Sequence, residues 1–302
     1  MLPTFLLIGA MKAGTTALYN MLGAHPEVYM SPVKEPNFFA FAGRELDFRA
    51  PIDQRPDGIN NTSITDRDEY EALFDAADPQ SARGEASHTS LYWPDAAENI
   101  RRLVPDVRLV AILRDPVERA YSEFMHFRRD GDEPLEDFEA ALDAEPKRIA
   151  ANWALGRYVD RGRYDEQLMR YYDRFDREQI RIFLHEDLTR QPDMLAANLF
   201  SHIGVDPDVQ PELGRRVNKS GIPNNPWIHS VLTRLQPVKE LLDPVIPGRV
   251  IDLANQLKNR NLEKPKMDER LRERLAETFQ PHIERLEKLI DRDLSHWLSA
   301  TP

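Results

Sequence analysis

Three short runs of mostly apolar residues stand out in an otherwise mixed sequence. They cover residues 4–8, 108–113 and 180–184. Continuous apolar runs of this length, without regular polar alternation, are typical of strands buried on both faces of a parallel sheet. We therefore predict three core strands at these positions.

Helical patterns separate and follow these runs, because apolar residues recur there at intervals of three or four. The first apolar residues of the patterns are Leu18, Val117, Tyr164, Leu195 and Leu271. Asp115 and Pro116 supply a helix N-cap and a proline at the first helical position. Strands that alternate with helices predict an α/β fold, with a central, mainly parallel sheet flanked by helices.

Length and composition indicate one globular unit. The chain has 302 residues, of which 41% are apolar and 30% are charged, as in ordinary folded domains. The pattern shows no internal repeat and no linker, so we expect a single domain over residues 1–302. Residues 42–70 are rich in proline, aspartate and asparagine, and we expect an irregular excursion there.

Charge and cysteine content exclude several classes of function. The net charge of −11 argues against nucleic acid as the main partner, because phosphate backbones are bound by basic surfaces. The first 40 residues are locally neutral, with only Lys12, Glu27, Lys34 and Glu35 charged, which leaves room for an anion site. The chain has no cysteine, so thiolate metal sites and a cysteine nucleophile are excluded. The histidines show no metal-ligand spacing.

The first apolar run does not resemble a targeting segment. It has no basic residues before it and ends at Gly9, so we interpret it as a buried strand and not as a signal peptide. No apolar run approaches the roughly 20 residues that a membrane helix needs. The expectation from sequence is a cytoplasmic protein without a transmembrane segment.

The segment between the first strand and the first helix has the features of an anion-binding turn. Gly9 and Gly14 have the spacing of a phosphate-binding loop, in which backbone N–H groups converge at a helix N-terminus. In the nucleotide-triphosphate version a lysine follows the second glycine, but this chain has Thr15 there and Lys12 inside the turn. The turn is therefore P-loop-like, but its lysine is expected to reach a different bond from the one that a P-loop lysine reaches at the β- and γ-phosphates.

A second anion anchor is Arg114, which directly follows the second predicted strand. Ligands of open parallel sheets bind beyond the carboxyl ends of the strands, so Arg114 and Lys12 are expected to face one crevice. Arginine suits a phosphate monoester because its guanidinium donates two parallel hydrogen bonds. A structural ion pair with Asp115 or another carboxylate is the alternative for Arg114.

Taken together, these segments resemble the PAPS-dependent sulfotransferases, especially the bacterial and heparan-sulfate-type branch. Residues 5–16 resemble the family's loop for the 5′-phosphosulfate, and residues 113–124 resemble its 3′-phosphate segment, with Arg114 and Ser122 eight positions apart. Residues 218–223 resemble a late loop that closes over the nucleotide. Weaker matches are residues 84–87, 162–168, 186–188 and 293–297.

The resemblance implies a set of nucleotide-binding residues. The turn residues Ala13, Gly14, Thr15 and Thr16 are expected to hold the 5′-phosphate, and Lys12 is expected to neutralise the bridging oxygen as PAP departs. Arg114 and Ser122 are expected to bind the 3′-phosphate. Lys219, Ser220 and Gly221 of the late loop are expected to contact the nucleotide. Relatives often carry an arginine after the proline of that loop, where this chain has Asn224 and Asn225.

The implied reaction is a metal-free, in-line transfer of a sulfuryl group from PAPS to an acceptor hydroxyl or amine, with PAP as product. A base must take the acceptor proton. Glu35 lies in a segment that resembles the heparan-sulfate-type catalytic segment, and its place before Pro36 predicts extended backbone. A structural pairing with Lys34 is the alternative for Glu35. His88 is the rival base because neutral imidazole suits pH 7. The resemblance implies a small-molecule, glycan or lipid acceptor and favours a sugar.

Several alternatives remain open from sequence. One is a P-loop nucleotide kinase, which requires a lysine where Thr15 stands. Another is a nucleotide-binding scaffold without catalysis. The arginine-rich stretch of Arg157, Arg161 and Arg163 fits either an anionic acceptor or a solvated helix end.

Overall fold

The computed structural model describes residues 1–56, 58–78, 81–209, 222–223, 262–263 and 266–298. Its centre is a five-stranded sheet with the order β2-β3-β1-β4-β5. Each neighbouring pair is parallel. The strands are β1 (Phe5–Gly9), β2 (Val28–Met30), β3 (Ala82–Ala86), β4 (Arg108–Leu113) and β5 (Ile180–Leu184).

The three strands predicted from apolar runs are confirmed as β1, β4 and β5. All five residues of β1 are buried, since this strand lies between β3 and β4. Strand β3 was not predicted. Its sequence, Ala-Arg-Gly-Glu-Ala, has no apolar run, yet it pairs with β1 over Gly84, Glu85 and Ala86.

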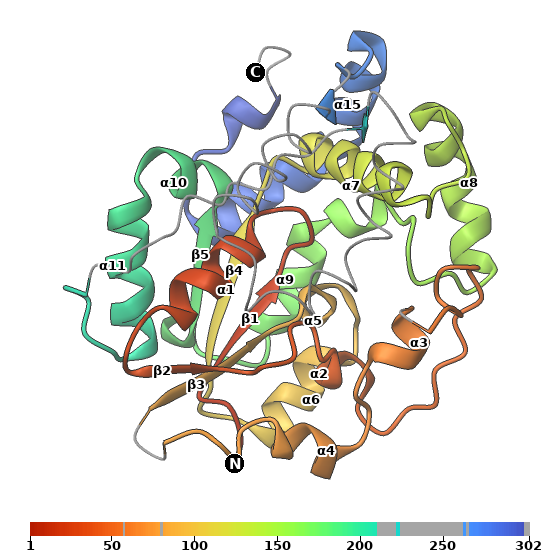
Figure 1. The fold of residues 1–302 in the computed structure, drawn as a ribbon. Helices are drawn as coiled ribbons and strands as arrows, with labels where there is room; N and C mark the ends of the chain where they lie inside the picture. Colours follow the sequence, from red (N-terminus) through yellow and green to blue (C-terminus); the bar gives the residue numbers. More distant parts are fainter. Residues whose placement is uncertain (57, 79–80, 210–221, 224–261, 264–265, 299–302) are drawn as a thin grey trace, which may run out of the picture.

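Helices flank the sheet, as predicted (Figure 1). The described helices of six or more residues are α1 (Thr15–Gly23), α4 (Arg67–Ala72), α6 (Ala96–Leu103), α7 (Pro116–Asp130), α8 (Phe138–Ala150), α9 (Tyr164–Tyr172), α10 (His185–Arg190), α11 (Pro192–Ile203) and α15 (Glu269–Ile290). Helix α1 packs on β1, β2 and β3, whereas α11 packs on β4 and β5. The short helix α5 (His88–Tyr92) packs on β1 and α9, and α15 packs on α7 and α9.

Shorter elements fill the connections. The predicted excursion at residues 42–70 contains α3 (Ile59–Thr62) and the start of α4. Two further short helices are α2 (Phe38–Phe41) and α5 (His88–Tyr92). Strand β6 (Ile222–Pro223) pairs antiparallel with β7 (Leu262–Glu263) and lies beside α7. Within the described ranges, no helix combines the length and the apolar character needed to cross a bilayer.

The register of the sheet positions the functional segments. Phe5 pairs with Gly84 on one side and Arg108 on the other. The carboxyl ends of β1, β3 and β4 therefore meet at one edge. The β1–α1 turn, the β3–α5 connection and Arg114 all leave the sheet at this edge.

Gly84 allows the close approach of β1 and β3, since a Cβ atom on Gly84 would lie 2.2 Å from the ring of Phe5. We predict that Gly84→Ala lowers the free energy of unfolding by about 1–3 kcal/mol, the usual effect of overpacking a core. Thermal or urea unfolding measures this. Gly23→Ala is the matched control, because its Cβ would make an ordinary 3.7 Å contact with Met30. Equal stability of the two variants would contradict the register described here.

Candidate active site

The β1–α1 turn is held in an unusual backbone conformation. Gly14 has a φ of 117° and Lys12 a φ of 62°. A Cβ on Gly14 would lie 3.0 Å from the side chain of Leu188, so glycine fits both the conformation and the space. His185 contacts the turn through a 2.8 Å hydrogen bond between its Nδ1 and the Ala13 carbonyl. The sequence assigned no role to His185.

This turn presents donors to an anion. It leads directly into α1, which starts at Thr15, and the first N–H groups of a helix have no intrahelical acceptor. Thr15 is buried, whereas Thr16 is exposed. The geometry matches a helix N-terminus that binds a phosphate or sulfate group.

Lys12 and Arg114 are brought together, as the topology predicted. The Arg114 guanidinium donates a 3.2 Å hydrogen bond from Nη1 to the Lys12 carbonyl. Burial lowers the pKa of Lys12 to about 8, and the nearby charges of Arg129 and Arg114 act in the same direction. Asp130 and Glu123 oppose this shift. Lys12 is therefore mostly charged at neutral pH and becomes neutral in mildly alkaline solution.

Arg114 also lies near a carboxylate, but not the one next to it in sequence. Its Nη2 is 3.6 Å from Oε2 of Glu118, and Arg272 also bonds to Glu118. Asp115 instead caps α7, because its Oδ1 accepts hydrogen bonds from the N–H groups of Val117 and Glu118 at 2.8 and 3.4 Å. This confirms the predicted N-cap. The sequence left open an ion pair of Arg114 with a carboxylate other than Asp115, and the contact with Glu118 is such a pair.

Ser122 lies on α7 and is buried, at 1% exposure. Its Oγ has no hydrogen-bond partner among the described residues. Such orphaned buried hydroxyls call for a partner. The late-loop candidates Lys219, Ser220 and Gly221, like Asn224 and Asn225, lie outside the described residues. The last two residues of the predicted late loop, Ile222 and Pro223, form β6 beside α7.

The two candidate bases, treated as rivals from sequence, lie in contact. Oε2 of Glu35 is 3.3 Å from Nε2 of His88, and Oε1 accepts a 2.6 Å hydrogen bond from Nζ of Lys34. Nδ1 of His88 is buried and has no hydrogen-bond partner in the described part of the chain. Burial acts to raise the pKa of Glu35, but the charge and hydrogen bond of His88, followed by those of Lys34, hold it well below its usual range.

The expectation of extended backbone at Glu35 is wrong. Its φ is 63°, in the left-handed region, and Asn37 has a φ of 59°. The reason is the neighbouring strand β3. The Glu35 N–H donates a 3.0 Å hydrogen bond to the Ala86 carbonyl, and this tertiary contact overrides the local preference before proline.

A buried carboxyl group lies at the end of β3, close to Glu35. Glu85 is 1% exposed and accepts a 2.7 Å hydrogen bond from Oγ of Ser87. Burial raises the pKa of Glu85 to about 8; the Ser87 hydrogen bond acts against this shift, and the charge of Glu35 adds to it. Glu85 is therefore mostly protonated at neutral pH.

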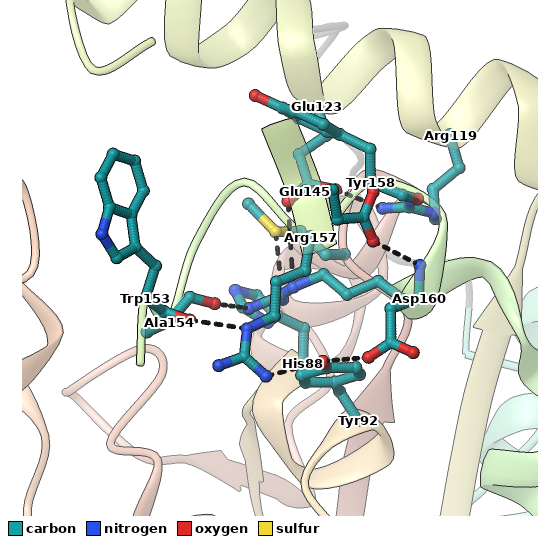
Figure 2. Close-up of polar contacts among 12 residues, drawn as sticks. His88, Tyr92, Arg119, Glu123, Glu145, Trp153, Ala154, Arg157, Tyr158 and Asp160 are labelled. Atoms are coloured by element: carbon teal, nitrogen blue, oxygen red, sulfur yellow. Dashed lines mark hydrogen bonds and ion pairs between the residues drawn. The ribbon is translucent and has the colours of Figure 1, made fainter. Parts of the chain in front are cut away.

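The arginine-rich stretch is not a solvated helix end. Arg157 and Arg161 are only 7% and 3% exposed. Arg161 lies over the Tyr92 ring at 4.8 Å. Arg157 donates a 3.1 Å hydrogen bond to the Tyr92 hydroxyl, which in turn bonds to Asp160 (Figure 2). Only Arg163 matches the solvated expectation, with a side chain that is 42% exposed.

This arginine cluster contacts the β1–α1 turn. Nη1 of Arg161 lies 3.5 Å from the sulfur of Met11, the residue before Lys12. Nε of Arg161 is 3.9 Å from Oε1 of Glu123, and Glu123 accepts a 2.5 Å hydrogen bond from Arg119. Both arginines and Glu123 are buried. Arg161 thus contacts the turn while its charge, like that of Arg119, is paired with Glu123.

The raised pKa of Glu85 leads to a prediction about stability. The ordinary value is 4.5, so between about pH 4.5 and 8 the folded chain binds more protons than the unfolded chain, and stability falls as pH rises. Glu85→Gln removes this titration. We predict that its Tm exceeds that of the wild type by more at about pH 8.5 than at about pH 5. Exposed Glu45→Gln is the control, and a pH-independent difference for Glu85→Gln would contradict the protonated carboxyl.

Comparison with known proteins places this chain in a family. A model described as the Sulfotransferase family matches residues 3–209, more than half of the chain. Carbohydrate sulfotransferase 15 of Homo sapiens is 28% identical over 256 residues, covering 68% of this chain and 44% of that protein. Bifunctional heparan sulfate N-deacetylase/N-sulfotransferase 4 of Mus musculus is 26% identical over 314 residues, covering 98% of this chain and 31% of that protein.

A solved structure gives the same result. The sulfotransferase from Alicyclobacillus acidocaldarius matches with a TM-score of 0.77 and 32% identity, over 99% of this chain and 100% of that one. This confirms the fold class predicted from sequence. This chain spans less than half the length of the curated relatives described above. The motifs, the fold and these matches agree: the chain belongs to the sulfotransferase family.

Proposed function

We propose that this chain transfers a sulfuryl group from PAPS to an acceptor hydroxyl or amine, with a carbohydrate acceptor favoured. The observation that carries the proposal is the contact between Arg114 and the Lys12 carbonyl at 3.2 Å. It supports the proposal because the two candidate anion anchors, which follow β1 and β4, lie at one edge of the sheet. The names of the curated relatives, which include a carbohydrate sulfotransferase and a heparan sulfate N-sulfotransferase, favour a sugar acceptor.

The residues at this edge fit a nucleotide with phosphates at two positions. The turn amides, with Thr15 and Thr16, suit the 5′-phosphosulfate. Arg114 suits the 3′-phosphate, and the orphaned Oγ of Ser122 is a donor without a partner in the described part of the chain. The donor nucleotide supplies the activated sulfuryl group.

Each protein group has one task in the proposed transfer. The sulfur–oxygen bond to the donor phosphate breaks as the bond to the acceptor oxygen or nitrogen forms. Lys12 neutralises the charge that develops on the departing oxygen. Because the sulfuryl group carries less charge than a phosphoryl group, we propose that Lys12 and the turn amides suffice without a metal.

Glu35 and His88 act together on the acceptor proton. A carboxylate stabilised by a neighbouring cation is a weaker base, so Glu35 accepts the proton best while His88 is neutral. Across the 3.3 Å contact, neutral His88 then stabilises the Glu35 carboxyl group after it has taken the acceptor proton. We therefore propose that Glu35 and His88 work as a pair, in place of the two rival bases considered from sequence.

Calorimetry with PAP tests the nucleotide site. We predict tight PAP binding without metal, and an affinity loss of roughly 10- to 100-fold in Arg114→Ala, because a charged hydrogen-bond donor to phosphate is removed. Arg174→Ala, which removes a guanidinium that bonds Glu98 on the surface, is the control and should bind PAP normally. Preference for ATP with magnesium, and no PAP binding, would support the kinase alternative instead.

The lowered pKa of Lys12 predicts how PAP affinity depends on pH. The charged form binds the anion, so the affinity should fall as pH rises through about 8. Lys12→Arg should lose this dependence, because arginine stays protonated throughout the range. Titrations of both proteins between about pH 6.5 and 9.5 measure it. A dependence that persists in Lys12→Arg would assign it to another group.

A further inference from the structure

The segment that carries Glu35 is strained. Glu35 and Asn37, on either side of Pro36, both have a positive φ, although neither is glycine. Left-handed backbone at such residues costs about 1–2 kcal/mol each and persists only where the surroundings enforce it. The contacts that enforce it are therefore informative about the position of Glu35.

Hydrogen bonds hold each residue of this segment. Besides the bond from Glu35 to Ala86, the Pro36 carbonyl accepts a 2.9 Å bond from the Ile64 N–H. The Asn37 N–H donates to Oγ of Ser87 at 3.0 Å. The Asn37 side chain donates to Oγ of Ser63 at 3.1 Å and accepts from Oγ1 of Thr89 at 2.8 Å.

Ser87 connects the segment to Glu85. Its hydroxyl accepts from the Asn37 N–H and donates to Oε2 of Glu85. Ser87, Asn37 and Glu85 are all buried. A hydroxyl has one proton, so donation to Glu85 turns a lone pair of Ser87 towards Asn37. Glu85 thereby fixes the direction in which Ser87 holds the strained segment.

We propose that Glu85 and Ser87 are positioning residues, which hold residues 34–37 so that the Glu35 carboxylate stays beside His88 and faces the acceptor. This rests on the proposed sulfuryl transfer. Neither residue is assigned a contact with PAPS or the acceptor. Ser87 directly precedes His88 on the chain, so one short segment positions both members of the pair.

The environment of Glu85 supports this arrangement. The titratable groups that influence or respond to it are Glu35, Tyr70 and Tyr171. A protonated Glu85 adds no negative charge next to Glu35. It keeps a carboxyl oxygen for Ser87 without weakening the pairing of Glu35 with Lys34 and His88.

The test compares turnover with nucleotide affinity. Sulfate transfer from PAPS to desulfated heparan sulfate, and calorimetric binding of PAP, are measured for each variant. Ser87→Ala and Glu85→Leu should lower kcat roughly 10- to 100-fold, the effect of a misplaced catalytic group, with the Kd for PAP unchanged within about twofold. Glu85→Gln retains a hydrogen-bonding oxygen and should keep kcat within about threefold of the wild type.

Ser90→Ala is the matched control. Ser90 is equally buried, but its side chain takes no part in the hydrogen bonds that join residues 34–37 to Ser63, Ser87 and Thr89, so turnover should be unchanged. Thr89→Val provides a second route should Ser87→Ala fail to fold. It keeps the shape of the side chain, removes the bond to Asn37 and should also lower kcat without changing PAP affinity.

The outcomes separate this inference from the proposed function. A wild-type protein that neither binds PAP nor transfers sulfate would overturn the function itself. An active wild type with normal kcat in Ser87→Ala, or in Thr89→Val where that variant is needed, would overturn the positioning role alone. A parallel loss of kcat and PAP affinity in Ser87→Ala, or a loss in Glu85→Gln as large as in Glu85→Leu, would also overturn it.

Discussion

The parallel pairing of β1 with both β3 and β4 is the constraint on which the site depends. Because the three strands run in the same direction, their carboxyl ends meet at one edge. The Lys12 turn, the segment containing Ser87 and His88, and Arg114 follow these three ends. Residues separated by about a hundred positions thus become neighbours, and Arg114 donates a hydrogen bond to the Lys12 carbonyl.

The second constraint is electrostatic. The chain carries a net charge of −11, yet an anion site requires a positive environment. The proposed anion site contains Lys12 with Arg114 and Arg129 nearby, and burial lowers the Lys12 pKa to about 8. Glu123 and Asp130 limit that decrease. Because these opposing effects leave the Lys12 pKa at about 8, Lys12 is mostly charged at neutral pH although it is partly removed from water.

Much of the fold could be predicted from the local pattern of apolar residues, but the candidate site could be predicted only in part. Strands β1, β4 and β5 were predictable because burial on both faces demands apolar residues. Strand β3 was not, since Glu85 enters the core as a mostly protonated carboxyl group and Gly84 leaves room for Phe5. The contact between Glu35 and His88, and the burial of Arg157 and Arg161, arise from tertiary neighbours that no spacing in the sequence encodes.

The most direct test of the account is the transfer of radiolabelled sulfate from PAPS to a panel of glycan, lipid and small-molecule acceptors. The wild-type chain should label at least one acceptor and release an equal amount of PAP. Glu35→Gln should bind PAP normally but lose at least about 100-fold in transfer, because the acceptor proton has no base. Full transfer by Glu35→Gln would contradict the assigned base. PAP binding without transfer to any acceptor would contradict catalysis and support a nucleotide-binding scaffold.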